Sequence, residues 1–343
     1  MRTVFISLLL ATLGITASSQ TIGGSSVFHF LNLPNCPQLT ALGGVNISNI
    51  TSDIAMTYNN PALLRNTMHG ELATVFNSMY AGIKNYHATA GYFYEKWQTN
   101  FSLGISYLNY GSIPQTDAAG NELGIFRPGD YVVQISASRN YLEKWHYGAS
   151  LKFITSNYGF YKSNGVAMDA GACYYDSVKQ MQVSLVMKNM GFQLRQYEGS
   201  RPDDLPFDLQ VGITKRLEKA PLQFSITAHH LHQFNIRYND TAFNNENEPG
   251  IDHSKKYTID KLFRHFVFAT QVYITEKVEV TAAYNHLRGK ELRIANTTNG
   301  LTGISMGIGI LFRKIQLRYA RAYYQNNTAY NQFGVNLKLS EMH

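Results

Sequence analysis

The sequence predicts an all-β protein, a 14-stranded antiparallel transmembrane β-barrel with an N-terminal plug segment. Three observations predict this fold: an export signal followed by no apolar helix, period-two alternation along most of the chain after residue 70, and connections that alternate between short and long. Composition agrees, because 15% of the residues are charged whereas a soluble domain carries about 25%. The 23 tyrosines and 19 phenylalanines suit a surface that meets lipid and carries amphipathic rings at its rims.

The first 19 residues have the pattern of a signal peptide. Arg2 supplies the positive charge, an apolar core follows over residues 4–15, and Ala17, Ser18 and Ser19 are small enough for cleavage. A transmembrane anchor is the alternative, but the apolar run is short for one. No later stretch of the sequence approaches the roughly 18 apolar residues that a membrane helix needs. We therefore expect export to the periplasm, the outer membrane or the exterior.

Residues 20–69 are expected to form a plug within the barrel. They alternate poorly and contain paired glycines and several prolines between short apolar clusters. Asn60, Pro61 and Ala62 read as an N-cap, a proline at the first helical position and the start of a short helix. A segment this apolar and this irregular should pack inside another structure, and a barrel interior offers such a space. A surface arm is the alternative.

Residues 70–343 are expected to form the barrel itself. In the hairpin 301–324, Ile304, Met306 and Ile308 alternate with small residues, the chain turns at Arg313 and Lys314, and the alternation then resumes. Period two places successive side chains on opposite faces of a strand, and a tilted membrane strand needs about 9–11 residues. The predicted strands are 70–80, 84–95, 98–110, 129–140, 143–156, 164–176, 180–192, 205–217, 220–234, 264–275, 277–290, 301–313, 314–325 and 331–341.

The connections between these strands support the same fold independently. They are tight after the even-numbered strands and mostly longer after the odd-numbered ones, notably at 111–128, 193–204, 235–263 and 291–300. Outer-membrane barrels have short periplasmic turns and longer outer loops, whereas the Greek-key crossings of a secreted β-sandwich follow no such rule. The connections therefore favour a barrel with both termini in the periplasm.

Two groups of side chains follow from this strand assignment. Tyrosines near strand ends should form girdles at the two membrane interfaces. Charges of both signs on the lumen face should pair with one another and with the plug instead of lining an ion-selective pore. The expected girdle residues are Tyr92, Tyr94, Tyr107, Tyr110, Tyr174, Tyr175, Tyr323 and Tyr324, and the expected lumen charges are Lys152, Asp169, Lys188, Asp208, Glu279, Arg318 and Lys338.

The sequence contains no G-x-S-x-G, S-x-x-K, H-E-x-x-H or P-loop motif. His230 and His232 of the cluster His229-His230-Leu231-His232 would share a strand face, but no carboxylate has convincing spacing for a metal, which favours a polar strand end. Cys36 and Cys173 are interpreted as free small residues, with an intrachain bridge as the alternative. The basic residues are scattered, which excludes a nucleic-acid footprint. We expect no enzyme, no cofactor and no metal.

Several stretches resemble one family across nearly the whole mature chain. They are SVFHFLNLPNCPQLTALGGVN, YNNPALL, LNYGSIPQTDAAGNELGIF, LVMKNMGFQLRQY and LPFDLQVGITKRLEKAPLQFSITAHHL. Together they are similar to the family of PorQ- and PorV-type outer-membrane barrels of the Bacteroidetes type IX secretion system, within the broader FadL-like group. The resemblance implies a fourteen-stranded barrel with a plug. The recurrent Asn-Pro-Ala of FadL-like plugs falls on Asn60, Pro61 and Ala62, and the resemblance supplies no catalytic residue.

The resemblance also implies partners. In the surface attachment complex of this secretion system, such a barrel works beside a PorV-like barrel, a PorU-like sortase and a PorZ-like surface protein, and the complex links cargo to lipopolysaccharide. The leading hypothesis is therefore a non-enzymatic scaffold of the cell outer membrane, in contact with its lipid and lipopolysaccharide, whose long loops hold a PorZ-like partner. The alternative is a FadL-like transporter of hydrophobic molecules, which requires a lipophilic pocket beside the plug.

Overall fold

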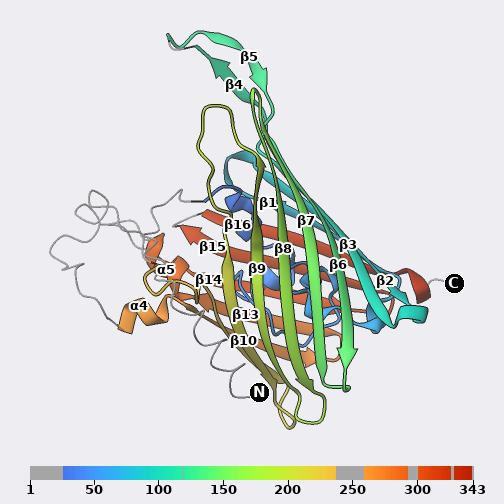
Figure 1. The fold of residues 1–343 in the computed structure, drawn as a ribbon. Helices are drawn as coiled ribbons and strands as arrows, with labels where there is room; N and C mark the ends of the chain where they lie inside the picture. The colour runs from blue at the N-terminus through green and yellow to red at the C-terminus, as the bar shows by residue number, and fades with distance from the viewer. Residues whose placement is uncertain (1–25, 118, 237–258, 293–299, 326–327, 342–343) are drawn as a thin grey trace, which may run out of the picture.

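The computed structural model describes residues 26–117, 119–236, 259–292, 300–325 and 328–341, and it shows a closed antiparallel barrel of fourteen strands around an N-terminal plug (Figure 1). The predicted fold is confirmed. The predicted signal peptide, residues 1–19, lies outside the described residues. In the described part of the chain, no helix is both long enough and apolar enough to cross a membrane.

Each barrel strand pairs with its neighbours in chain order, and β1 pairs with β16 to close the barrel. The barrel strands are β1 (Glu71–Ser78), β2 (Lys84–Tyr94), β3 (Thr99–Asn109), β6 (Gly129–Tyr141), β7 (Trp145–Tyr158), β8 (Tyr161–Asp176), β9 (Met181–Arg195), β10 (Asp208–Arg216), β11 (Leu222–Ala228), β12 (Phe266–Thr275), β13 (Val278–Asn285), β14 (Ile304–Leu311), β15 (Ile315–Gln325) and β16 (Thr328–Lys338).

The two faces of the wall differ in the way that the alternation predicts. On β6, Ile135 is 51% exposed while its neighbour Gln134 is 1% exposed. The outward belt is apolar, as lipid requires, and the inward face is polar. Six of the predicted lumen charges are buried: Lys152, Asp169, Lys188, Asp208, Glu279 and Arg318.

The connections confirm the predicted alternation of turns and loops. One end of the barrel has the short turns 95–98, 142–144, 177–180, 217–221, 276–277 and 312–314, and the other end carries the longer connections 110–128, 196–207, 229–265 and 286–303. The connections 79–83 and 159–160 on the long-connection end are short. We take the end with the long connections as the outer end.

Three sequence assignments at the outer end are wrong in detail. The predicted loop 111–128 contains a separate hairpin, β4 (Ile113–Thr116) and β5 (Glu122–Phe126), which projects beyond the barrel (Figure 1). The predicted strand 277–290 ends at Asn285, because the Asn285 side chain accepts a hydrogen bond from the Arg288 N–H at 3.0 Å and caps α5 (His286–Glu291). The predicted strand 220–234 ends at Ala228, shortly before His230 takes a left-handed φ of 54°.

Aromatic girdles form at both ends of the wall. At the outer end the Tyr107 ring stacks on Tyr131 with centroids 4.5 Å apart, and at the periplasmic end Trp145 packs against Tyr174 at 5.1 Å. The girdle prediction is wrong for three tyrosines, Tyr110, Tyr175 and Tyr324, whose side chains contact inward groups or line internal cavities. Alternation explains the last two, since the neighbours of an outward-facing ring must face inward.

The plug consists of short helical turns inside the barrel (Figure 1). Its elements are η1 (His29–Asn32), α2 (Pro37–Ala41), η2 (Ile54–Tyr58), η3 (Pro61–Leu63) and η4 (Asn66–Met68). Prolines stand at the first positions of α2 and η3, and the Asp53 carboxylate caps η2 by accepting the Ala55 N–H at 3.0 Å. Apolar plug residues, including Leu42, Ile54 and Met56, form a buried core with small wall residues.

Polar side chains of the wall hold the plug from several directions. Asn336 donates to the Asp53 carboxylate at 2.7 Å, Ser138 donates to the Leu64 carbonyl at 3.1 Å, and Asn285 donates to the Gly43 carbonyl at 3.1 Å. The last two bonds satisfy plug backbone carbonyls that have no ladder partner of their own. The polar lumen face therefore matches the irregular backbone of the plug. Cys36 and Cys173 are free and buried, which supports the preferred interpretation of the two cysteines.

Candidate functional site

A cavity of about 300 Å³ lies between the plug and the wall near the outer end of the barrel. Leu33, Leu39 and Val45 line it from the plug, while Leu287 and Leu292 line it from α5 and the residue after this helix. Charged and polar groups close another side of the cavity. We call this space the outer cavity. Its lining residues also include Asn32, Pro34, Gly43, Gly44, Asn59, Lys188, Asp208, Gln210, His229, His230, Asn285, Arg288, Glu291 and Tyr324.

Helix α5 covers part of the outer cavity, and Arg288 fixes its position. The Arg288 guanidinium donates to the Gly303 carbonyl at 3.2 Å and to the Ser305 hydroxyl at 2.5 Å. It also lies over the Tyr324 ring, 4.7 Å from the centroid. A guanidinium with donors in several directions and a stacked aromatic face is a rigid anchor. The arrangement joins α5 to β14 and β15.

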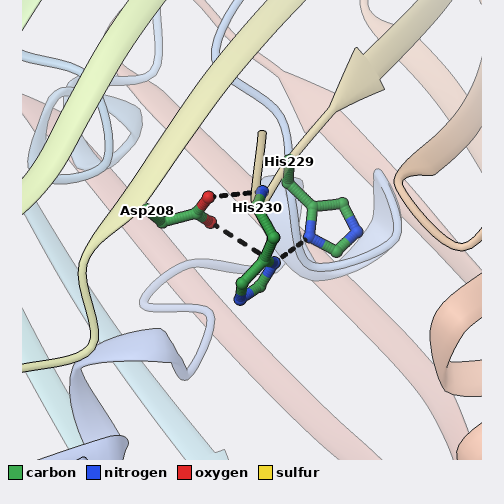
Figure 2. Close-up of side chains that lie close together, drawn as sticks. All are labelled: Asp208, His229 and His230. Atoms are coloured by element: carbon green, nitrogen blue, oxygen red, sulfur yellow. Dashed lines mark hydrogen bonds and ion pairs between the residues drawn. The ribbon is translucent and has the colours of Figure 1, made fainter. Parts of the chain in front are cut away.

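The polar side of the outer cavity is a cluster of Asp208, His229 and His230 (Figure 2). Asp208 is the first residue of β10, and the two histidines follow the last residue of β11. The Asp208 carboxylate accepts the His230 backbone N–H at 2.6 Å, and the two imidazole Nδ1 atoms are 2.5 Å apart. Burial lowers the pKa of His229 to about 3, so its ring is neutral near pH 7.

The sequence did not indicate the pairing of His229 with His230. Alternation placed His230 and His232 on one face, and their ring centroids are 6.1 Å apart, but the His230 ring lies closer to that of His229, at 4.7 Å. The ring of His232 packs against Phe207, with centroids 4.9 Å apart. The carboxylate that completes the cluster comes from the neighbouring strand, 21 residues before His229, so local spacing gave no signal of Asp208.

A second cavity of about 510 Å³ adjoins the outer cavity and shares Asn32 and His230 with it. It lies where the wall loses its regular pairing, because β9 pairs with β10 only up to Lys188 opposite Asp208. Beyond that point Asn189 has a left-handed φ of 56°, and its side chain donates to the Pro206 carbonyl at 2.9 Å. We call this side-chain contact between β9 and residues 203–207 the β9–β10 seam. It replaces a backbone ladder with isolated hydrogen bonds.

A third cavity, of about 560 Å³, lies near the periplasmic end, and its lining includes the charged residues Arg65, Arg216 and Arg318. Arg216 stacks on Tyr273, 4.1 Å from the ring centroid. Arg318 is held by the Asp53 and Glu279 carboxylates at 3.4 and 3.1 Å. The plug thus lies between a largely apolar outer cavity and a charged periplasmic one.

The plug motif Asn60-Pro61-Ala62 lies against β7 and β8, away from the outer cavity. The Asn60 side chain accepts the Ala62 N–H at 2.9 Å and donates to the Ile47 carbonyl at 2.7 Å. A Cβ at Gly148 would stand 2.7 Å from the Pro61 carbonyl, so the strand and the motif are in close backbone contact. Asn59, which the sequence analysis did not single out, accepts a hydrogen bond from Lys188 and lines the outer cavity.

No family model and no curated protein matches the chain. Among solved structures, the fold is similar to "TodX monoaromatic hydrocarbon channel deltaS2 mutant", with a TM-score of 0.50, 12% identity, and coverage of 89% of this chain and 98% of that one. A Pseudomonas aeruginosa FadL homologue has a TM-score of 0.46, 10% identity, and coverage of 89% and 98%. The Acinetobacter baumannii outer membrane protein Omp33 has a TM-score of 0.40, 9% identity, and coverage of 78% and 96%.

The barrel, its plug and the likeness to the TodX channel define the class of protein. The chain has the fold of an outer-membrane β-barrel, and this fold is similar to that of the TodX channel.

Proposed function

We propose that the protein is a FadL-like transporter that takes a small hydrophobic molecule into the outer cavity. The observation that carries this proposal is the largely apolar space beside the plug, the feature that the transporter hypothesis requires. Ligand pockets typically measure about 300–1,000 Å³, and an apolar cavity of about 150 Å³ already holds benzene. The outer cavity therefore suits a molecule of the size of one or two aromatic rings. The TodX neighbour is described as a monoaromatic hydrocarbon channel, a substrate class of that size.

The β9–β10 seam supports a route into this space. Backbone ladders join the described strands along most of the wall, but the seam relies on side-chain contacts such as Asn189 to Pro206 at 2.9 Å and Asp203 to Gln193 at 2.9 Å. Separating two strands at such a place breaks fewer hydrogen bonds than separating a regular pair. Phe192 and Leu194, both 62% exposed, flank the seam on β9 with apolar surface. Onward passage requires a shift of plug residues 32–34, which line the cavity.

Filling the outer cavity is expected to block uptake. In Val45→Trp, the indole would occupy the cavity from the plug side. We expect at least about tenfold slower uptake of a monoaromatic hydrocarbon, which corresponds to about 1.4 kcal/mol of lost binding. Uptake of a radiolabelled substrate into cells whose own transporters are deleted measures the effect.

Val211→Trp is the matched control, because Val211 faces lipid on β10 and is 40% exposed. It adds the same ring outside the cavity and should transport at the wild-type rate. Equal uptake by cells with and without the wild-type barrel would contradict transport. Equal rates in the wild type and Val45→Trp would contradict this cavity as the route.

A surface scaffold in a type IX attachment complex is the second candidate, and the β4–β5 hairpin favours it. The hairpin stands beyond the barrel (Figure 1), with Leu123 64% and Ile125 72% exposed. At its base a groove of about 300 Å³ is lined by Ile113, Phe126 and Phe160, among others. Exposed apolar groups on a rigid support are typical of a protein-binding surface. The proposed partner at this surface is a PorZ-like protein. The complex would also contain PorU-like and PorV-like components.

Charged substitutions on the hairpin separate the two candidates. Leu123→Lys with Ile125→Lys is expected to release the surface partner and to shed type IX cargo into the medium, while hydrocarbon uptake stays unchanged. The measurement is co-purification of partners in mild detergent together with cargo recovered from the medium. Retained partners and attached cargo in this variant would remove the hairpin from the scaffold role.

A further inference from the structure

The outer ends of β10 and β11 bring three typical metal-ligating side chains to one point. The nitrogen and oxygen ligand atoms of Asp208, His229 and His230 all lie within 4.8 Å of one another. Figure 2 shows the His229 Nδ1 and His230 Nδ1 atoms facing each other, with the Asp208 carboxylate on the other side of His230. The distance from His230 Nδ1 to Asp208 Oδ2 is 3.9 Å.

This ligand set and spacing match a divalent transition metal. Imidazole nitrogens with one carboxylate oxygen form a usual zinc set with bonds of about 2.0–2.2 Å, and a tetrahedron of such bonds separates neighbouring ligand atoms by about 3.3 Å. The two Nδ1 atoms must therefore open from 2.5 Å and the carboxylate must close from 3.9 Å. Each of these two distances changes by less than about 1 Å, and the third, between Asp208 and His229, is within 4.8 Å and closes by up to about 1.5 Å. The His230 side chain is 31% exposed and borders both the outer cavity and the adjoining cavity of about 510 Å³. This exposure leaves a coordination position for water or ligand.

Hydrogen bonding alone leaves this cluster incompletely explained. His230 holds a left-handed backbone, an arrangement that costs a non-glycine residue about 1–2 kcal/mol. His229 is 2% exposed, and its Nδ1 atom, 2.5 Å from His230 Nδ1, faces the cluster. Strained backbone is uncommon in native proteins and clusters at functional sites.

Neighbouring groups hold the three ligands in place. Gln210 donates to the Asp208 Oδ2 atom at 2.7 Å, and the His265 ring bonds the His229 carbonyl at 2.8 Å. The Leu231 N–H donates to the Leu209 carbonyl at 3.1 Å, which ties the histidine segment to β10. Outer partners of this kind orient ligands at known metal sites.

We propose that Asp208, His229 and His230 bind one divalent transition-metal ion, with zinc as the preferred ion, at the mouth of the outer cavity. The ion links the outer end of β10 to that of β11, next to the β9–β10 seam. It also brings a Lewis-acidic centre to the edge of the cavity, where a polar group on a ligand can reach it. The proposal is independent of which molecule the barrel transports.

Metal titration of the full-length barrel tests the proposal. The protein is purified in detergent without a histidine tag, stripped with EDTA and titrated with Zn²⁺ by calorimetry, and Co²⁺ is used as a visible-absorption probe. The wild type is expected to bind one equivalent and to give the Co²⁺ spectrum of mixed nitrogen and oxygen ligands. His230→Gln and Asp208→Asn are each expected to bind Zn²⁺ at least about 100-fold more weakly, since changes even in outer partners cost about 10–100-fold.

His69→Gln is the control. His69 lies near the periplasmic end, where its Nδ1 atom accepts the Phe93 N–H at 3.0 Å, far along the chain from the cluster. This variant should bind Zn²⁺ like the wild type. A gel shift between unheated and boiled samples verifies that each variant forms a closed barrel. Absence of a stoichiometric site in the wild type would overturn the proposal, and so would undiminished binding in a folded His230→Gln variant.

Discussion

Arg318→Met is expected to destabilise the barrel by about 3–5 kcal/mol, because removing one partner of a buried ion pair leaves uncompensated charge. Arg318 on β15 is 5% exposed and joins Asp53 of the plug, at 3.4 Å, to Glu279 of β13, at 3.1 Å. Its loss leaves two carboxylates in the lumen without their arginine partner and removes a direct link between plug and wall. Guanidinium unfolding in detergent micelles, followed by tryptophan fluorescence, measures the change.

Two further variants test whether the loss of stability in Arg318→Met comes from the buried charges. Arg321→Met removes an exposed arginine from the same strand and should cost less than about 1 kcal/mol, as expected for a surface interaction. Combining Arg318→Met with Asp53→Asn and Glu279→Gln removes all three charges and should recover most of the stability. If Arg318→Met were no more destabilising than Arg321→Met, the buried triad would have no structural role.

Gly148→Leu is expected to displace the plug motif from the wall. A Cβ at Gly148 would lie 2.7 Å from the Pro61 carbonyl carbon and oxygen, which are backbone atoms and cannot rotate away. Overpacking of this kind costs about 1–3 kcal/mol. Because the motif fills the lumen beside β7 and β8, we also expect a higher ion conductance than in the wild type. Planar-bilayer recordings and unfolding in micelles measure the two effects.

Ala149→Leu serves as the matched control for this substitution. Ala149 is the next residue on β7, and it is exposed on the lipid side of the wall. The same added side chain should leave conductance unchanged there, since it meets lipid instead of the plug. Equal conductance in the two variants would show that the plug tolerates the added volume at Gly148.

The lumen charges show that periodicity along a strand predicts which side chains face the lumen. Because period two determines which face a strand residue occupies, the sequence predicted that Lys152 and Asp169 would share the lumen, and their side chains form an ion pair of 2.6 Å. It also predicted pairing between lumen and plug charges, which Arg318 and Asp53 confirm. The small residues that alternate with Ile304, Met306 and Ile308 include Gly307, which faces the plug: a Cβ there would lie 2.5 Å from the Ala41 Cβ.

Periodicity fails where the chain leaves the strand conformation. The outer cavity depends on α5, whose cap at Asn285 ends β13 inside a stretch that the sequence assigned as strand. The candidate metal site includes His230, whose left-handed φ departs from the extended backbone that alternation assumes. Both changes arise from local backbone geometry at the outer end of the barrel, where no ladder enforces extended structure.

The sequence by itself determined the barrel, its fourteen strands, the side of each strand that meets lipid and the presence of an inner plug. These features depend on periodicity, loop length and composition, which can be read along the chain. The tertiary structure alone decided the outer cavity, the β9–β10 seam and the meeting of Asp208 with His229 and His230. The physical reason is that each of these features depends on contacts between segments far apart in sequence, whose geometry is set when the barrel closes around its plug.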